Sequence, residues 1–185
     1  MRVKVWGARG SVPAPGPEMS RYGGNTSCVE LELSDGSTLI IDAGTGIRSL
    51  GVGIAAKLPK VNILLTHLHL DHIQGLMFFA PCFRSDSELT IWGPSSPEAS
   101  LEERIARYIS APLSPVEVRE LPCEMSFLDT PATEWELGPA TIRAEPTERG
   151  GYRLAGGGAP CRAPRRSRYS SGSISPRASR SPRMA

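Results

Sequence analysis

One short segment, residues 66–72, contains every histidine of the 185-residue chain, together with Asp71. It follows residues 61–65, an apolar run with β-branched members that is typical of a buried strand. The histidines therefore begin where a strand ends, which is where α/β proteins usually place their chemistry. This segment constrains the fold and the function more than any other part of the sequence.

The spacing of these side chains suits metal ions. Residues two apart on an extended chain point the same way, so His67 and His69 can offer two imidazoles to one ion. Asp71 and His72 follow on the turn and can supply an oxygen and a nitrogen to a second ion. Imidazole and carboxylate without thiolate suit Zn²⁺, Mn²⁺ or Fe²⁺ rather than a cysteine-rich structural zinc site. The alternative, scattered surface or helix-capping histidines, is disfavoured by their clustering.

In the first half of the chain, the pattern of apolar and polar residues predicts strands and helices around this segment. Residues 1–6 alternate apolar and basic side chains, as an edge strand does. Residues 28–33 and 38–42 flank a turn sequence and predict a β-hairpin. Residues 47–57 predict an amphipathic helix, and a helix over residues 72–79 is expected to carry the last histidine.

The second half predicts one more strand, one helix and a second sheet. Residues 88–94 are an apolar strand that ends in a turn. Ser96 is expected to cap a helix, because proline and acidic residues follow it. Four short runs are expected to form the second sheet: 116–121, 126–128, 135–137 and 140–144. Trp92 and Trp135 are expected in the core.

Three further polar groups are candidates for the site. Asp42 ends a strand, where a carboxylate either accepts hydrogen bonds from loop N–H groups or orients the metal ligands from outside. The loop with Arg9 and Gly10 is either an ordinary tight turn or a close approach to an anionic ligand, with Arg9 adding charge. Asn25 lies in a second loop of this kind.

Residues 66–76 resemble the HxHxDH signature of the metallo-β-lactamase fold hydrolases. The resemblance implies that His67 and His69 bind one metal and that Asp71 and His72 bind another. It implies Zn²⁺ at two sites, with Mn²⁺ or Fe²⁺ as alternatives. The implied fold is an α/β (α+β) four-layer αββα sandwich made of two similar halves.

More narrowly, residues 6–13 and 22–27 look like the phosphodiesterase and ribonuclease Z branch of that family. This resemblance implies hydrolysis of phosphodiester bonds, in a cyclic nucleotide or a nucleic-acid-like substrate, by a metal-activated water that Asp71 holds. It assigns phosphate contacts to Arg9, Gly10 and Asn25. Another small ester substrate and a homodimer are compatible with it.

From Glu145 onward the sequence departs from the family pattern. The family would have a third histidine for the first metal near this point, then a bridging aspartate and a final histidine. Residues 151–153 are the expected Gly-Tyr-Arg, but no histidine precedes them, and after Glu148 there is no Asp, Glu or His. We therefore expect residues 1–150 to form a hydrolase domain whose second half is incomplete.

Charge divides the chain at the same place. Residues 1–150 hold 13 Lys and Arg against 19 Asp and Glu, a net charge of −6, while residues 151–185 hold 8 Arg and no acid. The second segment is rich in Gly, Ala, Pro, Ser and Arg and is expected to be disordered. Either it is a genuine basic tail that grips nucleic-acid phosphates, or the reading frame was lost near residues 145–155 and the chain is an inactive, truncated remnant.

Composition and cysteine spacing narrow the class of protein. The chain is 39% hydrophobic and long enough for one domain with a core. Its apolar runs are shorter than a membrane span, and residues 1–6 lack the apolar core of a signal peptide. Four cysteines lie far apart without a CxxC pair: Cys28, Cys82, Cys123 and Cys161. We therefore expect a cytoplasmic protein with reduced thiols and no membrane partner.

Overall fold

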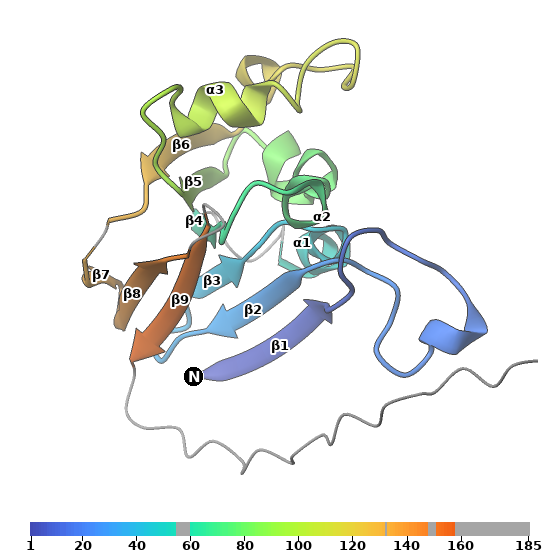
Figure 1. Ribbon diagram of the computed structural model, residues 1–185, viewed down its shortest axis with the longest axis horizontal. Coiled ribbons are helices and arrows are strands. Elements are labelled where there is room, and N and C mark those ends of the chain that lie inside the picture. The colour runs from blue at the N-terminus through green and yellow to red at the C-terminus, as the bar shows by residue number, and fades with distance from the viewer. Residues whose placement is uncertain (55–59, 132, 148–150, 158–185) are drawn as a thin grey trace, which may run out of the picture.

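The computed structural model describes residues 1–54, 60–131, 133–147 and 151–157. Its larger sheet is mixed and has the strand order β1–β2–β3–β4–β5–β6 (Figure 1). These strands are β1 (Arg2–Gly7), β2 (Cys28–Glu32), β3 (Thr38–Ile41), β4 (Lys60–Leu64), β5 (Glu88–Gly93) and β6 (Glu124–Asp129). The smaller sheet consists of β7 (Trp135–Leu137), β8 (Ala140–Pro146) and β9 (Tyr152–Gly157).

Short helices connect these strands. The α-helices are α1 (Gly46–Ile54), α2 (Leu70–Ile73) and α3 (Leu101–Ala106). The 3₁₀ turns are η1 (Pro17–Met19), η2 (Leu76–Phe78), η3 (Ala80–Phe83) and η4 (Val118–Glu120). No helix in the described ranges combines the length and the apolar character that crossing a lipid bilayer requires.

The pairing of the strands brings the ends of β3 and β4 to one edge of the large sheet. β2 and β3 form the predicted antiparallel hairpin, with Val29 opposite Ile41, and β1 lies at the edge as predicted. β3, β4, β5 and β6 run parallel, with Ile40 beside Ile63 and Ile63 beside Ile91. Because parallel strands end at the same edge, the residues that follow β3 and β4 come together there.

The large sheet is packed on both faces. Val61, Ile63 and Leu65 lie in the larger core cluster, which also contains residues of α1, α3, η2 and η3. Leu64 points to the other face, since side chains alternate along a strand, and packs there against Ile142 of the small sheet. The described residues therefore form helix, sheet and sheet layers, which are part of the expected αββα sandwich.

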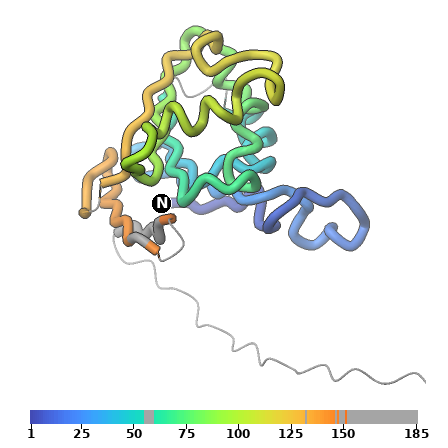
Figure 2. Tube along the Cα trace, turned by 45° about the horizontal axis from the view of Figure 1, so that its top comes forward, coloured from blue at the N-terminus to red at the C-terminus, as the bar shows by residue number. Residues whose placement is uncertain are grey.

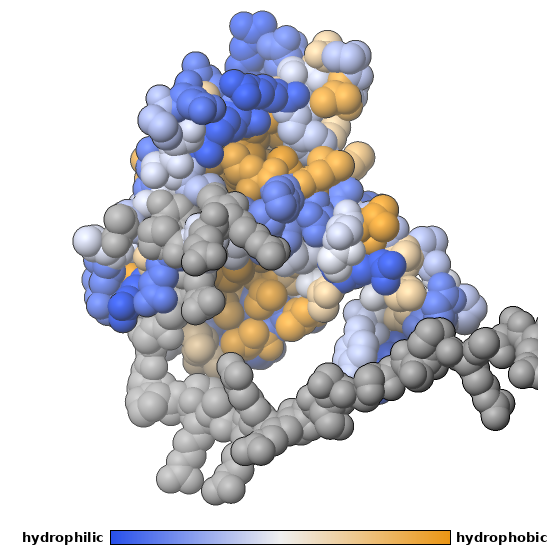
Figure 3. Space-filling model, in the orientation of Figure 1, coloured by the Kyte–Doolittle hydropathy of each residue, from blue (hydrophilic) through white to orange (hydrophobic). Residues whose placement is uncertain are grey.

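The small sheet leaves the first strands of that inner face open. Val3 and Val5 are 54% and 59% exposed, and Figure 3 shows apolar side chains gathered over this part of the molecule. Between β1 and β2, residues 8–27 form a long loop that extends away from the rest of the chain (Figure 2).

Three sequence predictions about these elements are wrong. The helix expected from Ser96 begins only at Leu101, and the single helix expected over residues 72–79 is divided between α2 and η2. The strand expected over residues 116–121 is instead the 3₁₀ turn η4, because Glu120 accepts a hydrogen bond from the N–H of Glu117 and closes a tight turn.

Two further predictions concern which sheet a segment joins. Residues 126–128 belong to β6, which pairs with β5 in the large sheet, so their assignment to the second sheet is also wrong. Residues 152–157, expected in the tail, continue the small sheet as β9, with Ala144 of β8 opposite Leu154. The expected division into residues 1–150 and 151–185 stays a prediction, since residues 158–185 lie outside the described residues.

Candidate metal centre

Asp42 and Thr66 fasten the ends of β3 and β4 to each other. The N–H of Asp42 donates to the carbonyl of Leu64 at 2.9 Å. In return, the N–H and Oγ1 of Thr66 donate to Oδ1 of Asp42 at 2.9 and 2.8 Å. Asp42 has φ of +61°, a left-handed conformation that aspartate tolerates better than most residues. The turn after β3 thus places its carboxylate directly beside the start of the histidine segment.

The same carboxylate holds His72. Its Oδ2 lies 2.7 Å from Nδ1 of His72 and also accepts a hydrogen bond from Oγ of Ser27 at 3.0 Å. Because a carboxylate accepts, Nδ1 carries the proton and Nε2 is left as the free nitrogen. Asp42 therefore accepts the loop N–H and also positions a histidine ring; its role toward a metal stays a prediction.

The three histidine rings form one cluster. The ring centroids of His67 and His69 are 4.5 Å apart, and those of His67 and His72 are 4.0 Å apart. His69 precedes α2 with an extended backbone, and its carbonyl accepts the N–H of His72 at 2.9 Å. The ring of His72 thus lies at least as near to that of His67 as the ring of His69 does.

Asp71 faces His72 and also binds the long β1–β2 loop. Its Oδ2 lies 3.6 Å from Nε2 of His72 and accepts a hydrogen bond from the N–H of Ser11 at 2.7 Å. Ser11 has φ of +65°, which turns its N–H toward Asp71. The sequence gives no sign of this contact, because Ser11 and Asp71 are far apart along the chain.

Charges and burial shift the pKa values of the cluster. The hydrogen bond to Asp42 raises the pKa of His72, against the opposing effect of burial. Burial and the neighbouring imidazoles lower the pKa of His67. Burial acts to raise the pKa of Asp71, but the Ser11 N–H and the nearby imidazoles hold it below its usual value. Neutral imidazole and ionised carboxylate are the forms that bind divalent ions.

Two glycines allow the motif to approach the turn after β3. A Cβ on Gly44 would meet the carbonyl oxygen of Asp71 and lie 2.5 Å from Oγ1 of Thr26. A Cβ on Gly75 would meet the carbonyl oxygen of Gly44. Two backbone hydrogen bonds form where the motif and the turn come close. The N–H of Ala43 donates to the His72 carbonyl at 2.7 Å, and the N–H of Gly75 donates to the Ala43 carbonyl at 2.8 Å.

The imidazole and carboxylate groups of this cluster are suitable ligands for a divalent ion, and one distance between two donor atoms also fits. Two ligands about 2.1 Å from a tetrahedral ion lie about 3.4 Å apart, close to the 3.6 Å between Nε2 of His72 and Oδ2 of Asp71. A carboxylate on the other ring nitrogen is the usual support of a ligating histidine. Across the described ranges, however, no three His, Cys, Asp or Glu side chains form a group that could hold an ion. The described residues thus provide one suitably spaced pair of donor atoms, Nε2 of His72 and Oδ2 of Asp71.

The side chains of Arg9 and Asn25, two of the expected phosphate-binding residues, make hydrogen bonds to other groups of the chain. Nε of Arg9 donates to the carbonyl of Val12 at 2.9 Å, and its Nη1 lies 3.4 Å from Sδ of Met19. Asn25 Oδ1 accepts from Oγ1 of Thr45 at 3.1 Å. Ser11, rather than the neighbouring Gly10, contacts the metal motif. Roles for Arg9, Gly10 and Asn25 in binding phosphate stay predictions.

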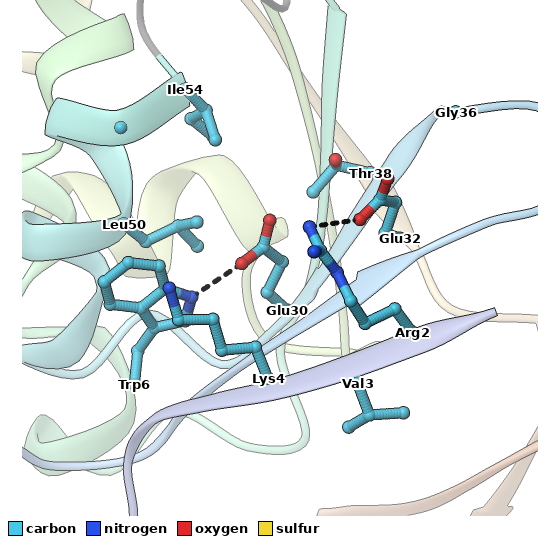
Figure 4. Close-up of a pocket in the computed structure, with 11 residues that line it drawn as sticks. Arg2, Val3, Lys4, Trp6, Glu30, Glu32, Gly36, Thr38, Leu50 and Ile54 are labelled. Atoms are coloured by element: carbon cyan, nitrogen blue, oxygen red, sulfur yellow. Dashed lines mark hydrogen bonds and ion pairs between the residues drawn. The ribbon is translucent and has the colours of Figure 1, made fainter.

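A shallow hollow of about 460 Å³ lies elsewhere, between β1, β2, β3 and α1 (Figure 4). Its charged groups are engaged by neighbouring side chains: Arg2 forms an ion pair with Glu32, and Glu30 accepts a hydrogen bond from Nε1 of Trp6 at 2.8 Å. Nζ of Lys4 lies 3.6 Å from the centroid of the Trp6 ring. Since these partners are all within the chain, the hollow does not indicate a ligand.

Comparison with known proteins identifies the family. A family model described as a beta-lactamase superfamily domain matches residues 37–161. The chain belongs to the beta-lactamase superfamily. This confirms the resemblance seen in residues 66–76, which lie inside the matched range.

Relatives within the superfamily are ribonucleases by name. The chain is 28% identical over 155 residues to ribonuclease Z of Mycobacterium sp. (strain KMS), covering 73% of this chain and 50% of the relative. It is 31% identical over 100 residues to ribonuclease BN of Proteus mirabilis (strain HI4320), covering 50% of this chain and 32% of that protein. The chain thus spans about half the length, or less, of these relatives.

Three solved structures share the fold. A diphosphatase from the PhnP family aligns with a TM-score of 0.59 and 18% identity, covering 84% of this chain and 62% of that chain. The metallo-beta-lactamase fold protein YhfI from Bacillus subtilis aligns with a TM-score of 0.54 and 23% identity, covering 83% and 56%. Zn²⁺-bound PqqB from Methylobacterium extorquens gives 0.54 and 15%, covering 85% and 60%. These likenesses confirm the fold predicted from the sequence.

Proposed function

We propose that this chain carries part of the active site of a metal-dependent hydrolase that cleaves phosphodiester bonds in nucleic acid or a nucleotide-like substrate. The arrangement of Asp42, His72 and Asp71 carries the proposal. A buried carboxylate holds one nitrogen of His72, and the other nitrogen lies 3.6 Å from a second carboxylate. The ribonuclease relatives support the phosphodiester substrate.

The residues of the motif have distinct roles in this proposal. His72 and Asp71 would hold one divalent ion, and His67 and His69 would contribute to the other. Bound ions would supply a Lewis acid for a phosphoryl oxygen and lower the pKa of a water toward neutrality. Asp42 keeps the proton on Nδ1 of His72 and so keeps Nε2 available. Asp71, whose pKa is held below its usual value, would accept a hydrogen bond from the attacking water.

The ion is Zn²⁺ in this proposal, with Mn²⁺ or Fe²⁺ as alternatives, because imidazole and carboxylate donors suit all three. The described residues provide a donor pair and no group of three. Each ion would therefore need further ligands beside these side chains.

Hydrolysis of bis(p-nitrophenyl) phosphate tests the proposal. We expect turnover by the full chain with added Zn²⁺ or Mn²⁺, and a loss of at least 100-fold in Asp71→Asn. Asp86→Asn is the matched control, because Asp86 is an exposed carboxylate that pairs with Arg84. Equal turnover by wild type and Asp71→Asn would contradict the role of Asp71. Absence of turnover with either ion would support the alternative of an inactive remnant.

Binding of nucleic acid through the arginine-rich C-terminal segment is a separate hypothesis. It concerns residues 158–185, which lie outside the described residues. Deleting these residues and measuring retention of single-stranded RNA at rising salt tests it, since phosphate contacts weaken steeply with salt. Binding that survives the deletion excludes this segment as its cause.

A further inference from the structure

A three-residue turn at the start of the β1–β2 loop lies against the metal motif. The N–H of Val12 donates to the carbonyl of Gly10 at 2.9 Å, and Ser11 between them has φ of +65°. A turn of this size with positive φ at its centre is rare and strained, above all at a residue other than glycine. The N–H of Ser11 donates to Oδ2 of Asp71 at 2.7 Å. The strained backbone therefore occurs at the residue that contacts a candidate metal ligand.

Arg9 holds this turn in place. Its Nε donates to the carbonyl of Val12 at 2.9 Å, and its Nη1 lies 3.4 Å from Sδ of Met19, which is further along the same loop. The N–H of Arg9 donates to the carbonyl of Asn25 at 3.0 Å, on the part of the loop that returns to β2. A guanidinium group offers donors in several fixed directions, which the ammonium group of lysine does not. Arg9 thus connects both ends of the turn to the rest of the loop.

The far end of the loop is fixed to the same motif. Thr26 is fully buried, and its Oγ1 accepts hydrogen bonds from the N–H of Thr45 at 2.9 Å and from Nε2 of Gln74 at 3.1 Å. Gln74 lies two residues after His72 in the sequence. Although the loop extends away from the rest of the chain (Figure 2), both of its ends are therefore attached to the segment that carries the histidines.

These contacts give Arg9 a role different from the phosphate contact that the family resemblance implies. Its Nε and Nη1 face Val12 and Met19 of its own loop. A carboxylate oxygen has two lone pairs, so Oδ2 of Asp71 can accept the Ser11 N–H and still face an ion. Hydrogen bonds to a ligating carboxylate fix its orientation, and losing them weakens metal binding.

We propose that Arg9 and Ser11 are positioning residues, which together hold the carboxylate of Asp71 in the orientation that metal binding needs. Arg9 keeps the turn closed, and the turn presents the Ser11 N–H to the carboxylate. The consequence for metal binding rests on the proposed function, in which Asp71 is a ligand. The contact itself belongs to the protein without metal, so it can be tested separately.

Amide hydrogen exchange of the metal-free full chain, followed by NMR in the presence of chelator, tests the contact. We expect the Ser11 N–H to exchange about 10-fold faster in Asp71→Ala and in Arg9→Ala than in wild type, because each change frees this donor. Arg21→Ala is the matched control. It removes the same charge from the same loop, and Arg21 lies over the Tyr22 ring, 4.9 Å from its centroid. Its Ser11 N–H should exchange as in wild type.

Zn²⁺ affinity, measured by competition with a chromophoric chelator, tests the positioning role. We expect Arg9→Ala to bind Zn²⁺ about 10-fold more weakly than wild type and Arg21→Ala to bind it equally. A second pair separates backbone from side chain. Ser11→Gly and Ser11→Val both lose the hydroxyl, but only glycine adopts positive φ freely. Ser11→Val should therefore bind Zn²⁺ about 10-fold more weakly than Ser11→Gly.

Three results would overturn the proposal. They are equal exchange of the Ser11 N–H in wild type and Asp71→Ala, unchanged Zn²⁺ affinity in Arg9→Ala, and equal affinity in the two Ser11 variants. A phosphate contact by Arg9 would give the second result together with a raised KM for bis(p-nitrophenyl) phosphate. If Arg9→Ala fails to fold, the two Ser11 variants decide. If wild type binds no metal, the proposed function fails, and the exchange measurement still shows whether the turn holds Asp71.

Discussion

Asp42 accepts four hydrogen bonds, which come from Ser27, from the N–H and hydroxyl of Thr66 and from the His72 ring. Its side chain is almost completely buried, so these bonds replace the water that the carboxylate loses on folding. Three of these bonds tie the end of β3 to the end of β4 and the histidine segment, and the bond from Ser27 adds the loop that precedes β2. Asp42 thus serves both the stability of the sheet edge and the geometry of the candidate site.

The variant Asp42→Asn tests both of these roles. The amide keeps the shape of the side chain but loses the charge, and it places an N–H group among donors. We expect metal affinity to fall about 10- to 100-fold, and the free energy of unfolding to fall by roughly 2–4 kcal/mol. Chelator competition and urea unfolding measure the two effects. The exposed Asp86→Asn is the control, and unchanged affinity in Asp42→Asn would contradict the positioning role.

The sequence brings the candidate metal donors together in one segment but does not predict the contacts that hold them. His67, His69, Asp71 and His72 stand within one short segment, so their spacing alone indicates a metal site. The bond from Ser11 to Asp71 joins distant parts of the chain. It depends on the left-handed backbone of Ser11, which residue types do not specify.

Among the elements, α3 shows how a helix start is selected. Oγ of Ser100 accepts the N–H of Glu103 at 3.2 Å, and Oε2 of Glu103 accepts the N–H of Ser100 at 2.8 Å. Ser96 accepts only the N–H of Glu98 among the described contacts. A serine with a glutamate three residues later satisfies two free N–H groups at once, which explains why the helix begins at Leu101.

Replacing each serine separately distinguishes the observed cap, Ser100, from the expected one, Ser96. We expect Ser100→Ala to lower the free energy of unfolding by about 1 kcal/mol. Ser96→Ala is the matched control and should leave it unchanged within about 0.5 kcal/mol. Urea unfolding of both variants gives the comparison. Equal losses in the two would show that Ser100 has no special role as a cap.

The turn after β3 packs closely against the backbone of the metal motif at Gly44. Gly44→Ala places a Cβ against the backbone of Asp71, and we expect a loss of about 2–3 kcal/mol in unfolding free energy together with weaker metal binding. Gly53→Ala, in α1, is the control: its Cβ meets nothing within 4 Å, and it should stabilise the helix by roughly 0.5–1 kcal/mol. Tolerance of Gly44→Ala in both measurements would contradict the close packing.

At the level of the whole molecule, strand identity was easier to predict than sheet membership. The apolar runs of β2, β3, β4 and β5 identify strands directly. The sequence pattern places β6 in the wrong sheet, because an apolar run identifies a strand but not the strand that lies beside it. That is decided by its parallel pairing with β5. The strand predicted around Val116 failed because its apolar residues reach the core from irregular and 3₁₀ backbone.

The contact between the two sheets is a further test. Ile142 of β8 is 3% exposed and packs against Leu39 and Leu64. We expect Ile142→Ala to cost about 2–4 kcal/mol of unfolding free energy, because it leaves a cavity between the sheets. Val3→Ala, on an exposed position of β1, should cost less than about 0.5 kcal/mol. A small effect of Ile142→Ala would mean that the small sheet is not packed there.

The number of metal ions per chain tests the central claim most directly. The full chain is purified without chelator, dialysed and examined by elemental analysis, beside His69→Ala and the control Asp86→Asn. The account predicts at least about one divalent ion per chain in wild type and control, and a marked loss in His69→Ala. A wild-type chain without bound metal, or equal metal content in all three proteins, would contradict it.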